Sequence, residues 1–150
     1  MNKWVVLLLT VFVFMPTAHA DESFVQVKSN HSVADTSARL ETVLLEKGMN
    51  VFATIDHAAG AAKAGMELSP TELVIFGNPK VGTPLMKCGP TVALDLPQKA
   101  LIWEDESGQV WLAYNRPEYL AARHGLEGCD EVLAKVSKAL AGFADAATQP

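Results

Sequence analysis

Two histidines could carry chemistry in this sequence. His57 follows a stretch that is predicted to be a strand, and His124 ends a short predicted helix, so both lie where side chains of different elements can converge. Together with a carboxylate such as Asp95 or Glu104, they could bind a metal ion or transfer protons. No H-x-x-x-H, H-E-x-x-H or C-x-x-C-H spacing supports a metal site. The alternative is two separate histidines that make local hydrogen bonds.

Sulfur-containing residues suggest a second kind of centre. Met86 and Cys88 lie two residues apart, and sulfur ligands near a histidine suit copper(I) or a haem iron. Met86 is also the kind of residue that fills apolar cores. Cys88 could instead pair with Cys129 in an oxidising compartment, or both thiols could stay free. The sequence leaves the metal site, the disulfide and the free thiols open.

A stretch rich in glycine and proline over residues 77–90 is the third candidate. Gly77 and Gly82 have the spacing of a phosphate-binding loop, but Thr83 and Pro84 stand where such a loop needs Lys followed by Ser or Thr. This excludes nucleotide hydrolysis. The stretch still predicts backbone donors at a strand end, suited to a small anion or polar ligand, unless it only forms a turn. We expect a loop with a short helix that has Thr83 as its N-cap.

Composition limits the remaining function classes. The chain has 150 residues and is 49% apolar, which suits one domain with a core. Its 12 basic and 17 acidic residues argue against a nucleic-acid partner. Residues 1–20 have a charged start, an apolar run and an Ala-x-Ala site ending at Ala20, the pattern of a secretory signal peptide. We therefore expect a periplasmic or secreted protein with no stable membrane insertion after cleavage.

An α+β arrangement is predicted to position these residues. Apolar patterns predict strands over residues 23–29, 49–56, 71–76, 98–104 and 109–114. Helical periodicity and end signals predict helices over 33–48 after Ser32, 58–65, 115–124 with Asn115 as its cap, and 129–144, with a frayed tail beyond. This order predicts one domain over residues 21–150, an antiparallel or mixed sheet with helices on one face. Trp111 and Tyr114 point to opposite faces, so we expect helices to cover one face and a second subunit the other, unless ordinary core packing explains both aromatic residues.

Seven segments, in their order and spacing, carry a resemblance to a known family. They are residues 55–60, 72–79, 82–86, 93–97, 102–105, 114–115 and 119–126. These segments resemble the bacterial domain of unknown function 302, over about residues 23–142. The resemblance implies a compact α+β domain that pairs into a homodimer, and it implies no particular reaction. The two cysteines look peculiar to this sequence.

The leading hypothesis is an exported binding or accessory protein whose partner is a small molecule or another protein. Its pocket would be lined by residues at strand and helix ends, namely His57, Asn78, Thr83, Asp95, Tyr114, Asn115, Arg123 and His124. A periplasmic metal- or haem-binding protein that uses His57, Met86 and His124 is one alternative. An enzyme that uses a histidine with a carboxylate is the other.

Overall fold

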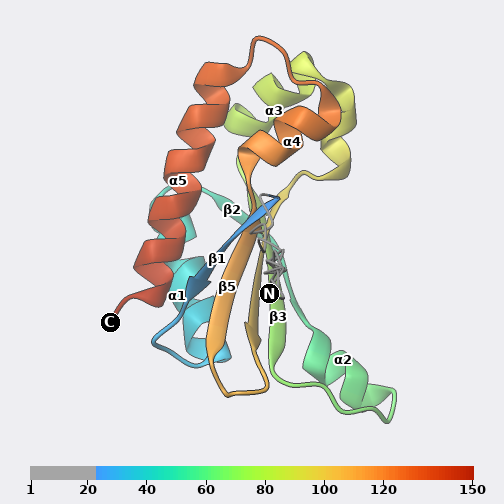
Figure 1. Cartoon of the computed structure of the whole chain (residues 1–150), viewed down its shortest axis with the longest axis vertical. Coiled ribbons are helices and arrows are strands. Elements are labelled where there is room, and N and C mark those ends of the chain that lie inside the picture. The colour runs from blue at the N-terminus through green and yellow to red at the C-terminus, as the bar shows by residue number, and fades with distance from the viewer. Residues whose placement is uncertain (1–22) are drawn as a thin grey trace, which may run out of the picture.

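The computed structural model describes residues 23–150, and Figure 1 shows a sheet with helices packed along it. The sheet has five strands in the order β1-β5-β4-β3-β2, and every neighbouring pair is antiparallel. The strands are β1 (Phe24–Lys28), β2 (Asn50–Asp56), β3 (Thr71–Gly77), β4 (Gln98–Glu104) and β5 (Val110–Asn115). The predicted α+β class is confirmed. The predicted signal peptide, residues 1–20, lies outside the described residues.

Within residues 23–150, five α-helices and one 3₁₀ helix accompany the sheet. They are α1 (Val33–Glu46), α2 (His57–Lys63), α3 (Pro79–Cys88), η1 (Pro90–Leu94), α4 (Pro117–His124) and α5 (Asp130–Thr148). Helix α1 begins where the sequence predicts, because the Ser32 side chain accepts a hydrogen bond from the backbone N–H of Asp35. Helices α1 and α5 pack against each other and against the sheet.

The core lies between the sheet and these two helices. Strand alternation places one set of side chains toward the helices, where they are almost fully buried: Val74, Phe76, Ala100, Ile102 and Leu112. Leu40 and Leu44 of α1 complete this layer. Phe143 of α5 meets Phe76 edge to face, with the ring centroids 6.3 Å apart. The side chains on the opposite face of the sheet are only partly buried, among them Leu73, Ile75, Leu101, Trp103 and Trp111.

The hairpin between β4 and β5 is held by one carboxylate. Asp105 accepts hydrogen bonds from the Ser107 hydroxyl at 2.6 Å and from the Trp111 indole N–H at 2.7 Å. The backbone N–H groups of Ser107 and Gln109 bind the same carboxylate. All of these donors favour the charged form, so the pKa of Asp105 falls from 3.8 to about 2, with the Ser107 hydroxyl as the largest cause.

Two predicted helix starts are wrong. Helix α3 begins at Pro79, five residues before the predicted start, because the Asn78 side chain caps it by accepting a hydrogen bond from the N–H of Lys80 at 2.9 Å. Thr83 and Pro84 lie inside this helix. The N-cap of α4 is Arg116, because Asn115 is still paired with Phe24 in the sheet.

The predicted frayed tail is also wrong. Helix α5 continues to Thr148, and both Ala147 and Thr148 are fully buried. The backbone N–H and the side-chain amide of Asn30 both donate to the carbonyl of Thr148, at 3.0 and 3.2 Å. Arg39 donates to the carbonyl of Gln149 at 2.8 Å. The start of the domain therefore holds the last turn of α5 in place.

Candidate functional site

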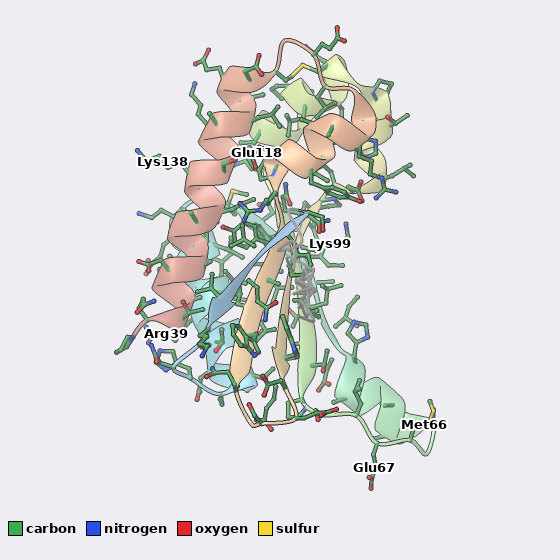
Figure 2. The ribbon with its side chains drawn as sticks, in the orientation of Figure 1. Arg39, Met66, Glu67, Lys99, Glu118 and Lys138 are labelled. Carbon is green, nitrogen blue, oxygen red and sulfur yellow. A yellow bond between two sulfur atoms is a disulfide. The ribbon has the colours of Figure 1, made fainter. Side chains whose placement is uncertain are left out.

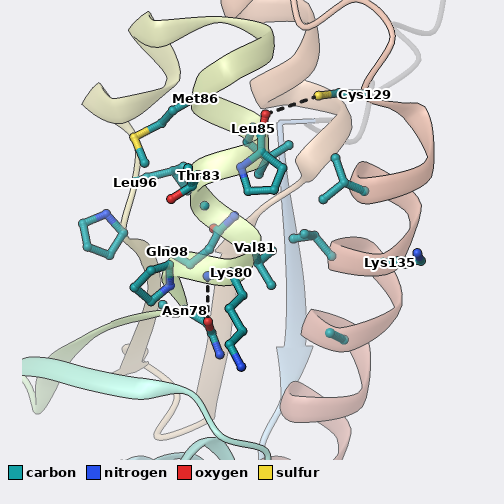
Figure 3. Close-up of a pocket in the computed structure, with 18 of the residues that line it drawn as sticks. Asn78, Lys80, Val81, Thr83, Leu85, Met86, Leu96, Gln98, Cys129 and Lys135 are labelled. Carbon is teal, nitrogen blue, oxygen red and sulfur yellow. Dashed lines mark hydrogen bonds between the residues drawn. The ribbon is translucent and has the colours of Figure 1, made fainter.

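A cavity of about 990 Å³ lies between α3, α5 and one end of the sheet. Figure 3 shows α3 and α5 side by side, with Gln98 of β4 next to α3. Most of its lining is apolar and comes from the two helices, chiefly Val81, Leu85, Met86, Val132, Val136, Ala139, Leu140 and Phe143. This cavity is the main candidate for a functional site among the described residues.

Local chain geometry brings α3 to this position. Gly77 ends β3, and Asn78 starts the helix at once, with proline at its first position. The side-chain amide of Asn78 also donates to the carbonyl of Gly48 at 2.9 Å. Asn78 therefore fixes the start of α3 against the turn between α1 and β2, while its oxygen caps the helix.

A disulfide joins the far ends of the cavity walls. Cys88 is the last residue of α3 and Cys129 is the N-cap of α5; they are bonded, with their Cα atoms 6.4 Å apart. Figure 2 shows this bond in yellow, at the end of the molecule away from α2. Both cysteines contribute to the cavity lining. The cross-link occupies the Cys88 sulfur, so Cys88 is not available as a thiolate ligand beside Met86.

One polar side chain in the cavity wall stands out. Gln98 is only 7% exposed, and its side-chain nitrogen has no hydrogen-bond partner among the described residues. Gln98 opposes Phe76 in the sheet and shares the core-facing side of β4 with Ala100 and Ile102. A buried amide without a partner is costly, and such groups in native proteins call for an explanation. A ligand that accepts a hydrogen bond would provide one.

A second cluster of polar side chains joins η1 to α4, outside the cavity. The ring nitrogen Nε2 of His124 lies 2.6 Å from Oδ2 of Asp95, and Nδ1 lies 3.1 Å from Oγ1 of Thr91. Arg123 pairs with Asp95 at 3.2 Å. A hydroxyl, an imidazole and a carboxylate in this order can activate a nucleophile in hydrolases. Here the His124 side chain is only 4% exposed, and Thr91 and His124 are absent from the cavity lining, so the cluster ties two elements together.

The structure separates the residues that the sequence places in one pocket. Asn78, Thr83 and Met86 line the cavity, whereas Asp95, Arg123 and His124 form the second cluster. Tyr114 is buried in the core and Asn115 ends β5, and neither lines the cavity.

His57 lies far from both groups. It is the exposed first residue of α2, directly after β2, and β2 runs antiparallel to β3. The end of β2 therefore lies beside the start of β3, at the opposite end of the sheet from Asn78, and Figure 1 shows α2 at the far end from α3 and α4. The predicted set of His57, Met86 and His124 is therefore not assembled. Within residues 23–150, no three His, Cys, Asp or Glu side chains are grouped so that they could hold a metal ion.

Gln98 is the functional candidate that the sequence reasoning missed. The signal was a polar residue in phase with Ala100 and Ile102, on the side of the strand that faces the core. A polar residue at such a position is either paired or available to a ligand.

Comparison with known proteins identifies the family. The family model of the domain of unknown function DUF302 matches residues 25–143. The chain belongs to this family. A DUF302 protein from Bacillus stearothermophilus has the same fold, with a TM-score of 0.75 at 20% identity, over 83% of this chain and 97% of that one. The resemblance expected from the sequence is confirmed.

Curated relatives of this DUF302 chain are named as fluoride-specific ion channels. This chain is 52% identical over 115 residues to "Fluoride-specific ion channel FluC 1" of Brucella suis and to "Fluoride-specific ion channel FluC 2" of Brucella melitensis. The match covers 77% of this chain but 45% and 43% of those proteins, so the chain spans less than half of their length. Among residues 23–150, no helix is long and apolar enough to cross a membrane.

Proposed function

We propose that this DUF302 protein binds a small molecule in the cavity between α3 and α5. The observation that carries the proposal is a cavity of about 990 Å³ with a mainly apolar wall, in which the lining residue Gln98 has a buried side-chain amide without a partner among the described residues. Ligand sites are typically apolar concavities of roughly 300–1,000 Å³ with a few polar groups that orient the ligand.

Binding of an uncharged fluorescent probe tests this proposal. N-phenyl-1-naphthylamine becomes bright in apolar surroundings, so we expect its fluorescence to rise saturably with the purified protein. The variant Ala139→Trp should abolish this rise, because Ala139 of α5 lines the cavity and the larger ring would occupy it. The control Ala141→Trp places the same ring on the same helix at a position that is exposed like Ala139 but lies outside the lining, and it should bind the probe normally. Equal binding by both folded variants would refute the cavity as the site.

Export of the protein is part of the proposal. The leader pattern of residues 1–20 supports it, and so does the Cys88–Cys129 disulfide, because disulfides persist mainly in oxidising compartments. Fractionation of cells that express the full chain should recover a form that begins at Asp21 in the periplasm or the medium. A full-length protein confined to the cytoplasm would contradict export.

The protein is further proposed to be a homodimer that pairs through the partly exposed face of the sheet. Support comes from the apolar residues on that face, including Leu73, Ile75 and Leu101. Light scattering should give twice the mass of one chain, and Leu101→Lys should give monomers. A monomer at all concentrations would contradict the proposal.

A second candidate function is that of an accessory domain for a membrane channel. Its support is the set of Brucella relatives named as fluoride channels, in which more than half of each protein lies outside the matched part. The matching half of such a protein could regulate the channel half, and this chain could act on a separate channel in the same way. Fluoride efflux from vesicles that contain the Brucella suis protein, with and without its matching half, tests the idea. Identical efflux rates would contradict it.

A further inference from the structure

The polar groups of the cavity are unevenly distributed. Asn78 and Lys80 lie at the start of α3, and Gln98 lies near them at the start of β4. Leu85, Met86 and the disulfide lie toward the other end of α3, as Figure 3 shows for the labelled side chains. The two amide side chains of the lining therefore lie with Lys80 at the start of α3, and an apolar wall follows α3 toward the disulfide, where Lys87 and the Glu131–Lys135 pair lie. Ten helical residues rise about 15 Å, so an extended apolar chain has room to lie along this wall.

Charge at the cavity is positive, although the whole protein is acidic. Three lysines line the cavity, namely Lys80, Lys87 and Lys135, and Glu131 is the one acidic residue among the described lining. Glu131 is already paired with Lys135, with their charged atoms 2.7 Å apart. Lys80 and Lys87 have neither a hydrogen bond nor an ion pair from their side chains within residues 23–150. With a net charge of −5 on the chain, this local excess of positive charge favours an anionic ligand.

Gln98 defines what the ligand must offer in the interior. Its side-chain nitrogen is buried and carries N–H groups without an acceptor, so the ligand needs an oxygen that accepts a hydrogen bond. A carboxylate oxygen is such an acceptor, and its charge would be balanced by the Lys80 ammonium group. Neither a neutral hydrocarbon nor a small inorganic anion would use both the amide and the apolar wall.

We propose that the ligand is a long-chain carboxylate, such as a free fatty acid. Its carboxylate accepts a hydrogen bond from the Gln98 amide and faces Lys80, and its acyl chain lies against Val81, Leu85 and Leu140. This inference rests on the proposed function of the cavity and adds the chemical class of the ligand.

Competition between related probes tests the class of ligand. Dodecanoate, its uncharged methyl ester and 1-dodecanol have the same chain, and each is titrated against bound N-phenyl-1-naphthylamine. We expect dodecanoate to bind about tenfold more tightly than either neutral compound, because it alone brings a charge to the start of α3. Gln98→Leu should weaken dodecanoate about tenfold, and Lys80→Met should weaken dodecanoate but not the methyl ester. Lys138→Met, on an exposed lysine of α5 that does not line the cavity, is the matched control and should change nothing.

The outcomes separate this inference from the proposed function. If the naphthylamine probe binds but dodecanoate is no tighter than its methyl ester, the carboxylate class is wrong and the cavity remains a binding site. If Gln98→Leu and Lys80→Met both leave dodecanoate binding unchanged, the assigned position of the carboxylate is wrong. If neither the probe nor any of the three dodecyl compounds binds, the proposed function itself fails.

Discussion

Removing the Cys88–Cys129 disulfide should destabilise the protein strongly. The two cysteines are 41 residues apart in the chain, and their bond closes this segment into a loop in the unfolded state. In the chain-entropy model, a loop of this length corresponds to about 4 kcal/mol at 25 °C. For a protein of this size, that loss would lower the Tm by about 10 to 20 °C. The free energy of unfolding of such proteins is only about 5–15 kcal/mol, so the reduced form should be much less stable.

Urea unfolding followed by tryptophan fluorescence measures this effect. Trp103 and Trp111 lie on the partly exposed face of the sheet and should report its unfolding. Chemical reduction of the native protein removes the cross-link without changing side-chain volume, and Cys88→Ala with Cys129→Ala removes it permanently. Both should lower the free energy of unfolding, and both should raise the urea m value, because the unlinked chain expands further. A loss below about 1 kcal/mol, or two reactive thiols in protein purified under oxidising conditions, would refute the reasoning.

Three further perturbations follow from single contacts. Gly89→Ala would place a Cβ 2.7 Å from Cδ2 of Leu126, so we expect a destabilisation of about 1–3 kcal/mol by overpacking, measured as a lower urea midpoint. Asp95→Ala leaves the buried ring of His124 without its carboxylate partner and should cost about 1–3 kcal/mol in the same assay. Asp105 has a pKa of about 2, below its ordinary value of 3.8. The stability that its charged form contributes is therefore present above about pH 4 and lost as the pH falls toward 2. The urea midpoint of Asp105→Asn should therefore depend less on pH over this window.

Two of these predictions have a control in the same chain. Gly60→Ala introduces a Cβ with no neighbour within 4 Å and should not destabilise α2. Arg123→Ala removes the half-exposed partner of Asp95 and should cost less than about 1 kcal/mol. Equal effects of Gly89→Ala and Gly60→Ala would contradict the packing argument, and a larger effect of Arg123→Ala than of Asp95→Ala would contradict the burial argument. A midpoint of the Asp105→Asn variant that still follows the natural protein from pH 4 to 2 would show that another group dominates.

The strands and the first helix could be predicted because their signals are local. Apolar alternation and the Ser32 cap are properties of a few neighbouring residues, and the structure has the same elements at nearly the same positions. The start of α3 was missed because Asn78 followed by proline also marks turns. The cap at Asn115 was wrong because pairing with β1, a contact across 91 residues of chain, extends the strand through it.

The site could be predicted only in part, because its parts converge through the topology of the sheet. Asn78 and Thr83, which the sequence suggests for a ligand site, both line the cavity, and their role in binding stays a prediction. His57 was grouped with Asn78 because each residue follows a strand. Consecutive antiparallel strands, however, finish at opposite ends of the sheet. Gln98 begins its strand and lies beside the end of β3 for the same reason. Once the sheet order is known, the separation of His57 and the approach of Gln98 both follow.

The contacts between Asn30 and the end of α5 affect when the first part of the domain can fold during synthesis. β1 leaves the ribosome before the other strands, yet its neighbour in the sheet is β5, and the residues that follow it bind the carbonyl of Thr148. β1 therefore acquires its neighbour in the sheet only after β5 has been synthesised, and Asn30 acquires its partner only after the last helix. Such late closure slows folding, since long segments must be ordered before their contacts form. For a protein exported as we propose, it would keep the nascent chain extended long enough to be threaded through a translocation channel.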